Sequence, residues 1–159
     1  DEMHLVWVSN GLWQHKKYRV TTDPGQFCLE NPEVYGSSAG TAILVPGQYP
    51  AYKWDLHAGK YETLCQRAST VRVWRDNNRD AKPDYHGPED VGWYGINIHK
   101  HRGADSRVNT GGVSAGCQVF RSSRDFSEFM ETCSDARDKW GNSFTYTLLD
   151  EADLHSCLI

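Results

Sequence analysis

The sequence predicts a single, mainly β domain, an antiparallel β-sandwich with one α-helix packed against it. Short β-prone runs separated by turn residues fill the chain up to about residue 120, a pattern typical of antiparallel sandwiches. A helical spacing of apolar residues follows once, after Phe126. The length of 159 residues suits one domain, 1–159, and an aromatic content of 12% supplies bulky side chains for its core.

Runs rich in Val, Ile, Tyr and Trp predict the strands in chain order. The predicted strands are residues 3–8, 17–22, 26–30, 41–45, 48–54, 70–75, 93–99, 116–120 and 144–149. Turns between them are expected at Asn10-Gly11, Asp23-Pro24-Gly25 and Pro46-Gly47, because Gly accepts a positive φ and Pro presets the first turn angle.

One segment has the periodicity of an amphipathic helix. Its apolar residues are Phe126, Phe129, Met130, Cys133 and Trp140. Ser122 or Ser123 can cap the start and Gly141 follows the end, so we expect a helix over about 124–139. Its apolar face is expected to contact the core rather than a cofactor.

Charge and hydropathy exclude two classes of partner. The formal net charge is −4, and no basic excess would attract nucleic acid. The apolar runs, such as 42–45, fall far below the roughly 18 residues needed to span a bilayer. We therefore expect neither nucleic-acid binding nor a membrane span.

The cysteines are odd in number: Cys28, Cys65, Cys117, Cys133 and Cys157. At most four can pair within the chain. Two disulfides among the other four would leave Cys117 as the free thiol, although buried core thiols are the commoner arrangement. No CxxC spacing is present, so a structural zinc site is not expected.

The stretch with most chemical information runs from Gly95-Ile-Asn-Ile-His99 to Ser114-Ala-Gly-Cys117. A thiol becomes a nucleophile when a neighbouring imidazole takes its proton and lowers its pKa. The N–H groups of Gly116 and Cys117 can then donate to the oxyanion of a tetrahedral intermediate. The residues predict acyl transfer, and the alternative is that Cys117 is a buried structural thiol.

The spacing of these residues resembles a known family. His99 is followed by fourteen residues and then by Ser114-Ala115-Gly116-Cys117, which is similar to the signature of the L,D-transpeptidases of the YkuD type. The resemblance implies that Cys117 is the nucleophile, that His99 is its base and that the Lys100 carbonyl holds the His99 ring. It also implies a sandwich fold of that family's type, no cofactor, peptidoglycan stem peptides as substrate, and an extracytoplasmic or cell-wall location.

The match has departures that leave the reaction's outcome open. Ala115 stands where that family usually has a second histidine, and Gln118 where it usually has an apolar residue. A hydrolytic carboxypeptidase or endopeptidase with the same site is one alternative, because water can replace the amine acceptor. A non-catalytic wall-binding or virion structural domain is the alternative from another class.

Three further residues are candidates for substrate binding: Ser114, Arg102 and Tyr94. An arginine can pair with a stem-peptide carboxylate. For Ser114 the alternative is a role within the turn, and for Tyr94 it is a place in the core or rim of the sheet. His101 is the alternative base, but the family spacing selects His99.

Acidic and amide side chains alternate at Asp76, Asn78, Asp80 and Asp84, as in the first half of a calcium loop. Gly87 occupies the position of the final bidentate Glu. A polar hairpin loop is therefore the expected structure, and calcium binding by this loop is the alternative.

Overall fold

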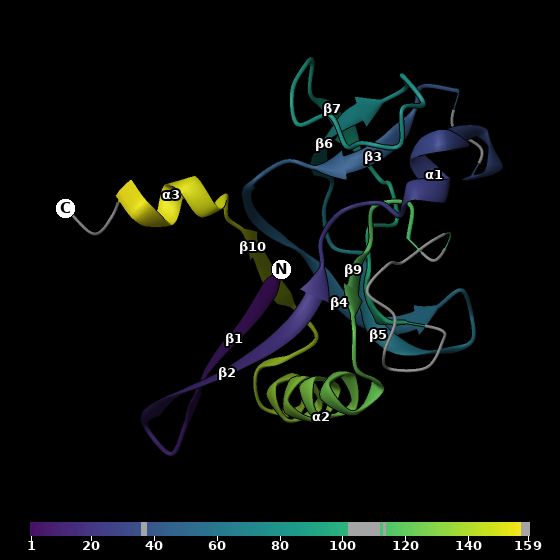
Figure 1. Cartoon of the computed structure of the whole chain (residues 1–159). Helices are drawn as coiled ribbons and strands as arrows, with labels where there is room; N and C mark the ends of the chain where they lie inside the picture. Colours follow the sequence, from purple (N-terminus) through teal and green to yellow (C-terminus); the bar gives the residue numbers. More distant parts are fainter. Residues whose placement is uncertain (36–37, 102–111, 113, 157–159) are drawn as a thin grey trace.

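The computed structural model describes residues 1–35, 38–101, 112 and 114–156, and its fold is mainly β, as predicted (Figure 1). A seven-stranded sheet has the order β1-β2-β9-β8-β5-β4-β10, and a three-stranded sheet has the order β3-β6-β7. The strands are β1 (Glu2–Ser9), β2 (Leu12–Thr21), β3 (Thr41–Leu44), β4 (Gly47–His57), β5 (Tyr61–Gln66), β6 (Val71–Asp76), β7 (Asp90–Gly92), β8 (Ile98–Lys100), β9 (Gln118–Phe120) and β10 (Phe144–Leu148). The helices are α1 (Gln26–Glu30), the 3₁₀ helix η1 (Pro32–Tyr35), α2 (Ser123–Trp140) and α3 (Glu151–Ser156).

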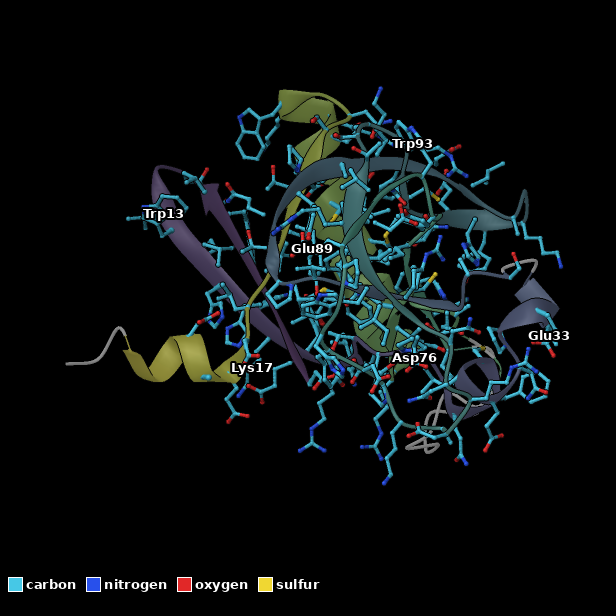
Figure 2. All side chains as sticks on the ribbon, turned by 90° about the horizontal axis from the view of Figure 1, so that it is seen from above. Trp13, Lys17, Glu33, Asp76, Glu89 and Trp93 are labelled. Carbon is cyan, nitrogen blue, oxygen red and sulfur yellow. The ribbon has the colours of Figure 1, made fainter. Side chains whose placement is uncertain are left out.

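The two sheets and α2 share one hydrophobic core. Val71 and Val73 of the small sheet are buried in the same cluster as Ile98 and Phe120 of the large sheet. Burial of such side chains is the main favourable term in folding. The far end of the β1–β2 hairpin extends away from this core, and Trp13 there is 76% exposed (Figure 2).

Helix α2 confirms the predicted helix and extends it by one residue at each end, to Ser123–Trp140. The Ser122 side chain accepts a hydrogen bond from the Asp125 N–H at 3.2 Å, which satisfies one of the unpaired donors of the first turn. The Phe129 ring of α2 lies 4.9 Å from the Phe120 ring of β9. The helix therefore fixes β9, the strand that follows the candidate nucleophile.

Strands β8 and β9 pair in parallel, with Ile98 opposite Gln118 and His99 opposite Val119. Every other strand pair among the described residues is antiparallel. The predicted antiparallel arrangement therefore holds for every strand pair of the described residues except this one. A parallel pair needs a crossover connection, and here the connection joins His99 to the Cys117 segment.

The predicted strand at 26–30 is wrong, because Gln26–Glu30 forms the short helix α1. The Cys28 and Leu29 N–H groups both donate to the Gly25 carbonyl. Cys28 and Leu29 are buried at adjacent positions, whereas a strand would bury alternate residues. The preceding Pro-Gly pair turns the chain into the helix instead of into a hairpin.

The predicted strand at 93–99 is shorter than expected, because only Ile98–Lys100 pairs as β8. The buried Gln66 side chain takes the place of a partner strand for the preceding residues. Its Oε1 accepts from the N–H groups of Tyr94 and Ile96, and its Nε2 donates to the Gly92 carbonyl at 3.0 Å. These bonds satisfy backbone groups that would otherwise be buried without partners.

The sequence prediction missed β5, β7 and α3, which lie at 61–66, 90–92 and 151–156. Ala58 and Gly59, both with positive φ, form the turn that pairs β5 with β4. Helix α3 extends away from the two sheets (Figure 1). Among the described residues, no helix has the length and apolar character needed to cross a bilayer.

Candidate active site

The candidate base and nucleophile lie on the same face of the large sheet. Directly paired residues of parallel strands point to one side, and successive residues alternate. His99 pairs with Val119, so Cys117 shares the face of His99. The Gln118 N–H donates to the Asn97 carbonyl at 2.9 Å, which places Cys117 beside Asn97. The helix α2 covers the other face, where Phe120 packs.

The Cys117 thiol is half-buried between two backbone groups. Its Sγ accepts from the Asn97 N–H at 3.4 Å and donates to the Gly95 carbonyl at 3.5 Å. Burial raises the pKa of Cys117 to about 11, and the Asn97 N–H offsets only part of this increase. The lowered pKa that we expected from the neighbouring imidazole is therefore wrong in direction, and the thiol rests in its protonated form.

The His99 ring is hydrogen-bonded to the backbone of the next residue. Its Nδ1 lies 2.9 Å from the Lys100 carbonyl oxygen. Since a carbonyl only accepts, Nδ1 carries a proton, and in the neutral ring Nε2 is then the nitrogen with the lone pair. His99 is only 2% exposed, so the ring orientation is fixed by its surroundings. In this tautomer Nε2 can accept a proton, as a general base must.

Ser114 and Gly116 form the turn that precedes Cys117. The Ser114 hydroxyl donates to the Cys117 carbonyl at 2.8 Å and accepts from the Gly116 N–H at 3.2 Å. Ser114 is 1% exposed, so its hydroxyl supports the turn, which was the alternative to substrate binding. The expected oxyanion role of the Gly116 N–H would require this hydrogen bond to open.

Gly116 is required by the geometry of the same turn. Its φ is +121°, and a Cβ there would lie 2.4 Å from the carbonyl oxygen of Ala42 on β3. No side chain fits at that distance, and L residues rarely adopt that φ. The small sheet thus approaches the backbone beside Cys117 closely enough to exclude any other residue type.

Tyr94 is held by the small sheet. The Arg75 guanidinium lies 4.5 Å from the centroid of its ring, and a hydrogen bond from Tyr94 lowers the pKa of Asp90. These contacts favour the structural alternative for Tyr94, at the rim of the sheet. Arg102, the other expected substrate residue, lies outside the described residues. Trp93 beside Tyr94 is 60% exposed (Figure 2).

Two residues of the site, His57 and Asn97, were not predicted from the sequence. The His57 ring stacks on the His99 ring, with centroids 4.6 Å apart and an interplanar angle of 24°. The Asn97 Nδ2 lies 3.0 Å from the His57 Nδ1. Asn97 lies two residues before His99, so the alternation of a strand could have placed both side chains on one face. No pattern in the sequence relates His57 to the residues of the motif.

The remaining candidates are placed away from this constellation. The His101 N–H donates to the Phe120 carbonyl at 3.0 Å and continues the β8–β9 ladder by one residue. No disulfide joins any two of the described cysteines, so the arrangement of two disulfides among Cys28, Cys65, Cys133 and Cys157 is wrong. Cys157 lies outside the described residues.

The Asp76–Asp84 segment is a polar loop. The Asp84 N–H donates to the Asp76 carboxylate at 3.0 Å, and the Asn78 amide donates to the Asp84 carboxylate at 2.9 Å. Burial raises the pKa of Asp76, and the hydrogen bond from the Asp84 N–H offsets part of this increase. In the described part of the chain, no three His, Cys, Asp or Glu side chains gather in a way that would hold a metal ion.

An apolar cavity of about 400 Å³ lies between β1, α2 and β10. Ile98 and Leu64 line it, and these residues point to the face opposite His99. The cavity is therefore separate from the candidate site.

Comparisons of the chain with family models, curated proteins and solved structures found no match.

Proposed function

We propose that this protein is a cysteine acyltransferase that acts on peptidoglycan stem peptides. The observation that carries the proposal is the hydrogen bond between His99 Nδ1 and the Lys100 carbonyl at 2.9 Å, on the strand that pairs with β9 directly after Cys117. It orients an imidazole as a base on the sheet face that carries the thiol. The substrate class comes from the sequence resemblance.

The chemistry begins from a protonated thiol, because burial raises the pKa of Cys117 to about 11. The S–H bond breaks as the proton passes to His99 Nε2, and the sulfur electron pair forms a bond to the carbonyl carbon of the stem peptide. The leaving D-Ala amine takes that proton when its C–N bond breaks, so the thioester forms with no net change in protons. An acceptor amine then forms a C–N bond to the thioester carbon as the C–S bond breaks, and the proton that the amine loses passes through His99 to the Cys117 sulfur.

General-base catalysis of this kind needs only that His99 is neutral when substrate arrives. The Asn97 N–H supports the developing thiolate, since it already donates to Sγ at 3.4 Å. Such charge-assisted bonds strengthen as the sulfur gains negative charge. A substrate of this class also places the proposed activity outside the cytoplasm, where peptidoglycan is assembled.

A stem tetrapeptide incubated with an amine acceptor tests the proposal, with products identified by mass spectrometry. Crosslinked peptide is the expected product, and trimmed peptide alone would assign the hydrolytic alternative to the same site. The Cys117→Ala variant should lose turnover by at least about 1000-fold, and His99→Ala by a similar factor. His15→Ala is the matched control, since His15 lies in the exposed β1–β2 hairpin. Wild-type turnover by Cys117→Ala would contradict the proposal.

A further inference from the structure

His57 lies against the candidate base although the two residues are far apart in the sequence. It is the last residue of β4, and its ring stacks on that of His99, with centroids 4.6 Å apart and an interplanar angle of 24°. At this separation the charge on one ring acts directly on the other. The protonation state of His57 therefore affects whether His99 can accept a proton.

The hydrogen bonds of Asn97 define that protonation state. The Gln66 N–H donates to Asn97 Oδ1 at 2.9 Å, so this atom is the amide oxygen and the other is the NH₂ group. The NH₂ group lies 3.0 Å from His57 Nδ1 and has only donors to offer. His57 Nδ1 must accept this bond, so it carries no proton, and the ring is neutral with its proton on Nε2.

A neutral ring in this place favours the charged form of His99. When His99 takes the Cys117 proton it becomes an imidazolium, which the π face of a neutral aromatic ring stabilises. A protonated His57 would instead place a second positive charge 4.6 Å away and would oppose the transfer. The Asn97 contact thus keeps His57 in the state that assists His99.

Other titratable groups lie on the elements around His57. On β5 the Tyr61 ring lies 5.5 Å from the His57 ring. On β8 the Lys100 ammonium lies 5.3 Å from the Tyr61 ring. On β4 itself, the Asp55 carboxylate pairs with Arg67 at 3.0 Å.

We propose that His57 is a positioning residue for the acyl transfer, a neutral imidazole held by Asn97 that stacks on His99 and enables it to accept the Cys117 proton. This inference rests on the proposed function. The proton moves from Sγ to His99 Nε2, and His57 neither gains nor loses one. The role therefore predicts a pH dependence that a purely structural contact would not produce.

The test measures the rate at which a carbapenem acylates Cys117, followed by intact mass from pH 5 to 8. In the wild-type protein both His57 and His99 must be neutral for acylation. At low pH a plot of the logarithm of the rate against pH should therefore reach a limiting slope of two, one for each proton. In His57→Phe, which keeps a flat ring without titration, the slope should become one. In His57→Ala the rate at pH 7.5 should fall about tenfold while the carbapenem concentration for half-maximal rate is unchanged.

A second variant tests the Asn97 contact. Asn97→Asp keeps an acceptor for the Gln66 N–H but presents an oxygen to His57 Nδ1, which would draw a proton onto that ring. Acylation should slow by at least about tenfold, and adding His57→Phe to the same protein should restore part of the rate. The control is His15→Ala, because His15 stacks on His4 with centroids 5.0 Å apart, outside the site.

The outcomes separate this inference from the proposed function. If wild-type protein is acylated and the His57 variants keep both its rate and its two-proton slope, the role of His57 is wrong. A slope of one in wild-type protein would also show that the role of His57 is wrong. If folded wild-type protein is not acylated at all, the proposed function fails and this inference fails with it.

Discussion

The backbone N–H of Asn97 donates to the Cys117 thiol sulfur at 3.4 Å. This bond joins the strand of the candidate base to the segment of the candidate nucleophile. It favours a negative sulfur, yet burial of the thiol has the larger effect and raises the pKa of Cys117 to about 11. The site is thus arranged for a thiol that loses its proton during the reaction rather than before it.

Alkylation tests this protonation state. With its pKa raised to about 11, Cys117 is almost entirely protonated at pH 8, whereas an ordinary thiol of pKa about 8.5 is partly thiolate. Cys117 should react with iodoacetamide at least about tenfold more slowly than glutathione at pH 8. The rate should keep rising up to pH 9.5, with Cys117→Ala as the background. A plateau at pH 6 to 7 would indicate a preformed thiolate–imidazolium pair instead.

Gly116→Ala tests the close approach of the small sheet. The added Cβ would lie 2.4 Å from the Ala42 carbonyl oxygen at a φ of +121°, so the free energy of unfolding should fall by about 3 kcal/mol or more. Gly11→Ala is the control, because its φ is +76° but no atom lies within 4 Å of the added Cβ. It should cost about 1 kcal/mol. Equal losses in urea unfolding would show that the contact with Ala42 is unimportant.

Ser114→Ala distinguishes a turn residue from a substrate contact. The variant removes the bonds to the Cys117 carbonyl and the Gly116 N–H, and it should lower the free energy of unfolding by about 1 to 3 kcal/mol. The KM for a stem peptide should not change. Ser127→Ala on the exposed face of α2 should have little effect on either quantity. A higher KM with unchanged stability would restore Ser114 as a substrate-binding residue.

Chelation tests whether the chemistry depends on a metal. Thiol and imidazole groups perform general-base acyl transfer without a Lewis acid, so dialysis against a chelator should leave the acylation rate of Cys117 unchanged. The melting temperature should also stay constant if the Asp76–Asp84 loop holds no calcium. Loss of activity that zinc restores, together with an unreactive Cys117, would instead assign His99, His101 and Cys117 as metal ligands.

The sequence predicted those parts of the fold that depend on local patterns. The apolar period of Phe126, Phe129 and Met130 predicted α2, because helix faces repeat within a few residues. It did not predict that residues 93–97 lack a partner strand, because a side chain from elsewhere, Gln66, satisfies their backbone. Such long-range contacts between a side chain and the backbone leave no periodic signal.

The candidate site, too, could be predicted only in part from the sequence. The spacing of His99 and Cys117 selected both residues from the sequence, and the structure places them on one sheet face. His57 belongs to a hairpin forty residues before Asn97, so only the folded sheet brings it to His99. The raised pKa of Cys117 was also beyond the sequence, because it arises from burial in the tertiary structure.

Cys117 is proposed as the nucleophile that accepts the acyl group, and the intact mass of the folded protein after incubation with a carbapenem tests this role. A strained β-lactam carbonyl reacts with an active-site thiol by ring opening, so the adduct keeps the whole mass of the compound. One adduct per chain is expected, located on Cys117 by peptide mapping, absent from Cys117→Ala and much slower to form in His99→Ala. If folded wild-type protein gains no mass, or if Cys117→Ala gains the same mass, Cys117 is not the nucleophile.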